Sequence, residues 1–123
     1  MRVLHALVVT ITLAGVAHAQ TATQEMAPAD VNKWINFFDK LVTVVVKTQT
    51  TCERMALDVS DLVDQNKDAI AVAKAARKQG KKLPAHAQQH MIEGVKKMVP
   101  AMQKCGQNEA VRAAFAKLDL SRK

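Results

Sequence analysis

Two cysteines lie on apolar stripes that repeat at helical spacing, and this placement limits the fold more than any other feature of the sequence. The steps alternate between three and four residues, a pattern typical of one face of an amphipathic helix. The first stripe comprises Trp34, Phe38, Leu41, Val45, Cys52, Met55, Val59 and Leu62, and the second comprises Met91, Val95, Met98, Met102 and Cys105. We therefore expect both cysteines to point inward at a contact between two helices. A disulfide there would fasten these helices to each other.

The first residues predict export, which favours that disulfide. Met1 and Arg2 precede a mostly apolar run from Val3 to Val16, which ends in Ala17-His18-Ala19. This arrangement is typical of a signal peptide with a small-x-small cleavage site. We expect residues 1–19 to be removed and the protein to work in the periplasm or outside the cell. Oxidising surroundings favour a Cys52–Cys105 bond over two buried free thiols.

The rest of the chain predicts one domain. Residues 20–29 are polar, include Pro28 and show no period, so we expect a disordered lead-in. Asp30 is a good N-cap for the first helix. We therefore place a single helical domain at residues 30–120.

The first helix is expected to be long and broadly apolar. Its stripe keeps phase as far as Leu62, which favours one continuous helix. The segment 43–51 is rich in β-branched residues, so a kink or a break with Thr50 or Thr51 as a new N-cap is the alternative. Apolar residues cover a wide arc of the helix between Val31 and Val46. A helix buried so broadly should touch at least two neighbours.

Turn signals divide the remainder into three further helices. The second spans about 67–79 and stops at Gly80, and the third follows Pro84, kinks at Pro100 and ends at Gly106. Asn108 is expected to cap a short fourth helix. The predicted fold is all-α: a small up-and-down bundle of about four helices, the first one long, stapled by one disulfide.

Charge favours anionic partners. Without Arg2, 17 Lys and Arg side chains face 11 Asp and Glu side chains. A basic run predicts either a solvated helix surface or a contact surface for an anionic partner; it comprises Lys74, Arg77, Lys78, Lys81 and Lys82. Nucleic acid is not expected as a partner, because the sequence has no Tyr and few aromatic rings to stack on bases. No segment of the mature chain is apolar enough to span a membrane.

One histidine pair suggests a metal site. His86 and His90 are four residues apart on the third helix, and Glu93 lies near the same side as a possible third ligand. The alternative is a pair of exposed polar residues. Nearby methionines could bind Cu(I) or a haem, although methionine more commonly fills core gaps. No nucleophile and base form a catalytic pattern, so we expect a protein that is not an enzyme and needs no cofactor.

Three segments carry a resemblance to known proteins. Thr51 to Met55, Gly80 to Pro84 and Met98 to Cys105 resemble parts of small secreted bacterial helical proteins with two cysteines. This resemblance covers about the last 75 residues and implies no activity. Thr-Cys-Glu around Cys52 and Pro-Ala before Cys105 are similar to periplasmic acid-stress chaperones of the HdeA type, which implies a chaperone role.

We therefore expect a non-enzymatic, exported helical binding protein, either chaperone-like or associated with the cell envelope. Its partner would be a protein client or an anionic envelope component. The alternative function is a metal or haem carrier that uses His86 and His90. A homodimer is a further alternative, because the first helix is so broadly apolar.

Overall fold

The computed structural model describes residues 24–118, so the predicted signal peptide at 1–19 and the segments 20–23 and 119–123 lie outside the described residues. The described chain contains five α-helices. They are α2 (Pro28–Lys47), α3 (Cys52–Gln65), α4 (Lys67–Lys78), α5 (Ala85–Cys105) and α6 (Glu109–Ala116). The predicted all-α bundle is confirmed.

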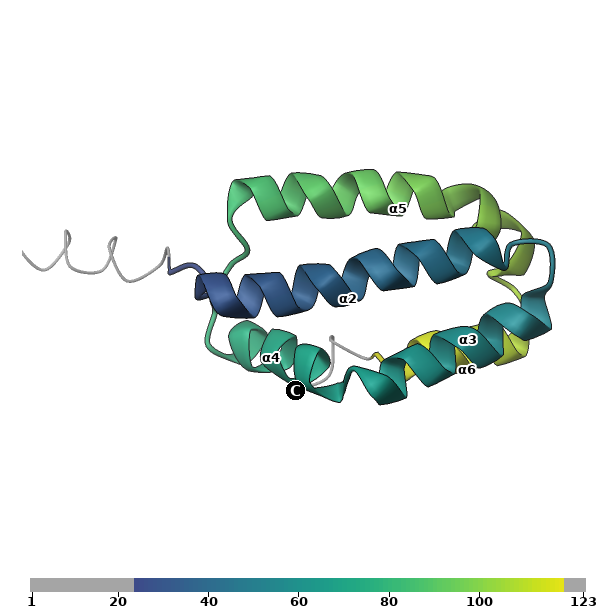
Figure 1. Ribbon diagram of the computed structural model, residues 1–123, viewed down its shortest axis with the longest axis horizontal. Helices are drawn as coiled ribbons and strands as arrows, with labels where there is room; N and C mark the ends of the chain where they lie inside the picture. The colour runs from purple at the N-terminus through teal and green to yellow at the C-terminus, as the bar shows by residue number, and fades with distance from the viewer. Residues whose placement is uncertain (1–23, 119–123) are drawn as a thin grey trace, which may run out of the picture.

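Helix α2 is the centre of the bundle. It lies between α5 on one side and the layer formed by α3 and α4 on the other, while α6 packs against α3 (Figure 1). Its buried side chains are Val31, Trp34, Phe37, Phe38, Leu41 and Val45. The wide apolar arc of α2 thus contacts three neighbouring helices, as its breadth predicts.

The expected long first helix is two helices, and this corrects the prediction of a continuous one. α2 ends at Lys47, and the chain turns through residues 48–51 before α3 begins at Cys52 with Thr51 as its N-cap. At the end of α2, the Thr48 hydroxyl donates to the Val44 carbonyl at 2.7 Å, and the Thr48 N–H donates to the same carbonyl at 3.0 Å. Both helices bury their apolar faces in the same core, so the stripe continues on the far side of the break.

The buried face of α5 differs from the predicted stripe. Val95 is 48% exposed, whereas Gly94 and Ala101 are buried together with Met98 and Cys105. α5 approaches α2 so closely that a Cβ on Gly94 would lie 2.4 Å from Cε2 of Phe38. Small residues therefore define this helix contact, and the larger Val95 is left at its edge.

The segment before α2 is ordered from residue 24 onward, which corrects the predicted disordered lead-in over residues 24–29. The Met26 N–H donates to the Lys82 carbonyl at 2.9 Å, and the Lys82 N–H donates to the Gln24 carbonyl at 3.0 Å. The Met26 side chain is buried. α2 begins at Pro28, which suits the first helical turn, so Asp30 lies inside the helix instead of capping it.

Other local predictions are confirmed. Gly80 has a φ of +69° just beyond the end of α4, a conformation that favours glycine. Asn108 caps α6 by accepting a hydrogen bond from the Val111 N–H at 3.1 Å.

Cys52 and Cys105 form the predicted disulfide, with their Cα atoms 5.3 Å apart. Because the first long helix divides, the bond joins the first residue of α3 to the last residue of α5. It therefore connects two helix ends rather than the middle of a long helix to the end of another.

The disulfide is expected to contribute a large share of the stability. The Cys52→Ala/Cys105→Ala variant should lose about 4 kcal/mol of unfolding free energy, because the bond closes a long loop in the unfolded chain. Chemical denaturation followed by circular dichroism measures this loss, and the helix content before unfolding should stay near that of the parent. Reduced parent protein is the control and should lose a similar amount. A loss below about 1 kcal/mol would contradict the prediction.

The close approach at Gly94 gives a second prediction. Gly94→Ala should destabilise the fold by about 1–3 kcal/mol, because overpacking against the buried Phe38 ring outweighs the gain in helix propensity. Thermal unfolding measures the change. The same substitution in a Phe38→Leu background is the control, where the penalty should shrink because the ring is gone. A Gly94→Ala protein more stable than the parent would show that the contact relaxes freely.

Candidate functional site

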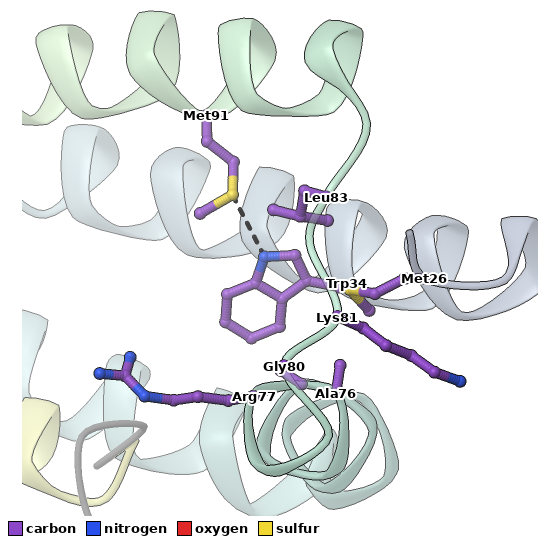
Figure 2. A pocket seen from close by; sticks show the side chains of 9 residues that line it. Met26, Trp34, Ala76, Arg77, Gly80, Lys81, Leu83 and Met91 are labelled. Atoms are coloured by element: carbon purple, nitrogen blue, oxygen red, sulfur yellow. Dashed lines mark hydrogen bonds between the residues drawn. The ribbon is translucent and has the colours of Figure 1, made fainter. Parts of the chain in front are cut away.

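The candidate site is an apolar groove at the end of the bundle where α2, α4 and α5 meet the loop after α4. The groove has a volume of about 340 Å³. The side chains around it come from the segment before α2, the three helices and the loop (Figure 2). The residues that line it are Met26, Trp34, Ala73, Ala76, Arg77, Gly80, Lys81, Leu83 and Met91.

Trp34 gives the groove its aromatic wall. The indole is 6% exposed, and its Nε1–H donates to the Met91 sulfur at 3.3 Å, a link between α2 and α5 (Figure 2). The Phe37 ring packs beside it at a centroid distance of 5.5 Å. Contacts on both sides therefore fix the indole, and the prediction that Trp34 belongs to the core is confirmed. Its second role in the groove has no signal in the sequence pattern.

Small residues on the side of α4 leave the groove open. Ala73 and Ala76 present only methyl groups to it, and Gly80 presents none. The left-handed backbone at Gly80 turns the chain at the end of α4, so that Lys81 and Leu83 also reach the groove. The alanine-rich composition of α4 thus has a structural consequence that a helix-propensity argument does not predict.

Two cations stand at the rim. Arg77 and Lys81 both line the groove, and their charged ends extend outward on opposite sides of the indole (Figure 2). Among the described residues neither forms an ion pair, since the pairs found there are Arg54–Asp58, His90–Asp39 and Lys117–Asp64. An anionic group at the mouth of the groove could therefore be paired without breaking an existing salt bridge.

The structure divides the basic run predicted as an anionic-partner surface. Arg77 and Lys81 line the groove, whereas Lys74 lines a separate depression with Asp64 and Lys117. Lys78 and Lys82 are exposed and line neither. Two residues of the run thus line the groove, and the other three lie outside it.

Charge is unevenly distributed along the chain. Between residues 67 and 105 there are nine Lys and Arg side chains and two Asp and Glu side chains. Between residues 24 and 66 there are four basic and seven acidic side chains. Two of the three helices around the groove, α4 and α5, therefore belong to the basic half, and the local field favours an anionic ligand.

The predicted metal ligands do not assemble into a site. Nε2 of His90 lies 2.5 Å from Oδ1 of Asp39, so His90 turns toward α2 instead of toward His86. Glu93 lines a depression with His90, Gly94 and Lys97 that does not include His86. Within residues 24–118, no three His, Cys, Asp or Glu side chains gather as metal ligands. The three-residue set predicted from spacing is corrected accordingly.

The methionines of the two stripes pack in or against the main core. Met55 and Met98 are buried in the main core, and Met91 accepts the hydrogen bond from Trp34. Their positions fit the filling of irregular core space, the alternative that the stripes left open.

No family model, curated protein or solved structure matches this chain. In residues 24–118 no helix has both the length and the apolar character needed to cross a bilayer.

The ion pair between Lys117 and Asp64, in the depression that Lys74 also lines, leads to a prediction about pH. The Lys117 ammonium lies 2.7 Å from Oδ1 of Asp64, and this hydrogen bond lowers the pKa of Asp64 from its ordinary value of 3.8. A lowered carboxyl pKa stabilises the fold above the unfolded pKa, and the contribution is lost as the pH falls through the folded pKa.

Lys117→Met should therefore raise the pKa of Asp64 toward 3.8, and its stability deficit relative to the parent should shrink in acid. Carboxyl titration by nuclear magnetic resonance and denaturation at several pH values measure both effects. Lys67→Met is the matched control and should shift the pKa less, because Lys67 acts on Asp64 only through its charge. Equal shifts in the two variants would contradict the assignment.

Proposed function

We propose that this protein is a non-enzymatic binding protein that holds a small amphipathic anion, such as a fatty acid, in the groove beside Trp34. One observation carries the proposal: an apolar groove lies directly beside two cations that have no ion pair among the described residues. Ligand sites are typically apolar clefts of this size with a few polar groups that orient the ligand.

The ligand class follows from the two parts of the groove. Trp34, Leu83, Met26 and Met91 offer hydrocarbon and aromatic surface, which favours a hydrocarbon chain. Arg77 or Lys81 can pair with a carboxylate or phosphate at the mouth. An anionic lipid fragment satisfies both, and this agrees with the expectation of an anionic envelope component.

The fold supports the groove over a chaperone-like client surface on α2. The broad apolar face of α2 is covered by α3, α4 and α5, so a client could reach it only after these helices move. An acid-triggered release of α2 would be favoured by buried carboxylates, but the Asp and Glu side chains in residues 24–118 are exposed or half-exposed. The groove, in contrast, is accessible in the folded protein, and the proposal needs no release by acid.

Trp34 allows a direct test, because it is the only tryptophan. We expect dodecanoate, kept below its micelle threshold, to change the tryptophan fluorescence saturably, while butyrate gives no response because it lacks the chain. Arg77→Gln/Lys81→Gln should weaken dodecanoate binding about three- to tenfold, a range set by exposed ion pairs. Ala73→Leu should abolish it by filling the groove.

Lys78→Gln is the matched control, because Lys78 is an exposed cation on the same helix that does not line the groove. Its affinity for dodecanoate should equal that of the parent. A flat titration with the parent protein would refute the proposal, and so would equal losses in Lys78→Gln and in the rim variant.

A further inference from the structure

A second depression lies on a different side of α4 from the groove. It has a volume of about 410 Å³ and forms where the end of α3, the first two turns of α4 and the residue after α6 meet. We call it the lysine depression. It shares no lining residue with the groove beside Trp34. The residues that line it are Val63, Asp64, Lys67, Ile70, Ala71, Lys74 and Lys117.

The lysine depression has an apolar floor between basic side chains. Val63 and Ile70, which belong to the main core, are buried and supply the floor. Lys67 and Lys74 lie seven residues apart in the sequence, on the same side of α4 as Ile70. They therefore stand one turn before and one turn after the Ile70 side chain. Lys117 approaches the same depression from the end of α6.

The protein itself occupies Lys117. Its ammonium donates to the Ser60 hydroxyl at 2.7 Å and to the Ser60 carbonyl at 3.3 Å, and it lies 2.7 Å from Oδ1 of Asp64. A lysine ammonium has three N–H donors, so these three acceptors use all of them. The Asp64 carboxylate is thereby held by Lys117, and Lys67 acts on it only through its charge.

Lys67 and Lys74 have no such partners. In residues 24–118 the ammonium hydrogen bonds come from Lys117, and the ion pairs include neither Lys67 nor Lys74. Lys74 is half-buried, so its ammonium is held close to the depression. Three lysines against one aspartate give the lining a net charge of +2. Two positive charges are thus available to a ligand over an apolar floor.

We propose that the lysine depression binds a phosphate monoester that carries an apolar group. A monoester has a charge of about −1.5 to −2 at pH 7, which matches the lining, whereas a carboxylate would leave one lysine unpaired. Lys67 and Lys74 pair with the phosphate oxygens as point charges, and the apolar group covers Val63 and Ile70. A free metabolite and a lipid headgroup both present this chemistry. The proposal does not rest on ligand binding in the groove.

Phenyl phosphate is the probe, because it joins a phosphate monoester to a small ring. In a nuclear magnetic resonance titration it should shift the backbone amides of Lys67, Ile70 and Lys74 saturably and leave the Trp34 indole unchanged. Benzoate, which has the same ring but one charge, should bind at least threefold more weakly. Lowering the pH from 7.5 to 5 should weaken phenyl phosphate binding up to about tenfold, because the phosphate takes up a proton near pH 6. Asp64 stays ionised over this range, since its pKa lies below 3.8.

Substitutions in the lining should change the affinity in both directions. Lys67→Gln/Lys74→Gln should weaken phenyl phosphate binding about three- to thirtyfold, a range set by two exposed ion pairs. Asp64→Asn should strengthen it about two- to fivefold, because the one carboxylate of the lining is removed. Lys78→Gln/Lys82→Gln is the matched control: it removes the same charge from exposed positions that line neither site. Its affinity should change less than twofold.

A lipid arm identifies the source of the phosphate. Vesicles that contain phosphatidic acid present the monoester on a lipid, and vesicles that contain phosphatidylglycerol present a phosphodiester with one charge. Flotation with phosphatidic acid but not with phosphatidylglycerol would support the proposal with a lipid headgroup as the ligand. Binding of phenyl phosphate without flotation would support it with a free monoester.

Circular dichroism confirms that each variant is folded before it is compared. The absence of binding to both phenyl phosphate and phosphatidic acid would overturn the proposal, as would equal losses in the depression variant and in its matched control. Shifts that include the Trp34 indole and disappear in Arg77→Gln/Lys81→Gln would assign the phosphate to the groove and overturn it. A chain that ends at Leu118 and binds at least tenfold more tightly would show that residues 119–123 occupy the depression, which also overturns it.

Discussion

Burial of α2 is the constraint on which the rest of the structure depends. The helix has apolar side chains over so much of its circumference that one partner cannot cover them, and α3, α4 and α5 all pack against it. The positions of α3, α4 and α5 follow from this arrangement, and α6 then packs against α3. Because α5 and α4 cover different sides of α2, the space between them becomes the groove beside Trp34. Because α5 packs mainly against α2, part of its surface stays exposed.

Much of this fold could be predicted from the periodicity of apolar residues and from turn residues. The helix class, the disulfide and the ends marked by Gly80 and Asn108 follow from local chemistry. The break at residues 48–51 could not be decided in the same way. In this chain the buried residues of α2 and α3 happen to share one sequence phase across the turn, so periodicity gives the same result for a bent chain and a straight one. The burial of Gly94 was hidden for a related reason, because hydrophobic patterns do not mark positions where a backbone approaches another closely.

Less of the candidate site than of the fold could be predicted from the sequence. The basic run includes residues at the end of α4 beside the groove, yet only the structure separates Arg77 and Lys81, which line the groove, from Lys74. The spacing of His86 and His90 suggested shared ligation, but Asp39 from a distant part of the chain contacts His90. Such long-range partners are not encoded in local spacing. Trp34 belongs to the core and to the groove at once, a double role that depends on how α4 and α5 are placed around it.

The disulfide has a topological consequence. Cys52 and Cys105 close a covalent ring that contains α3, α4 and α5, the three helices that surround α2. Helix α2 is outside this ring, and the turn at residues 48–51 is its covalent link to it. The molecule thus consists of a covalently closed ring of three helices around a central helix that is not part of the ring. Cutting the chain in that turn would leave two complementary pieces, held together by the packing of apolar side chains and by a few hydrogen bonds, such as those between Met26 and Lys82 and between Trp34 and Met91.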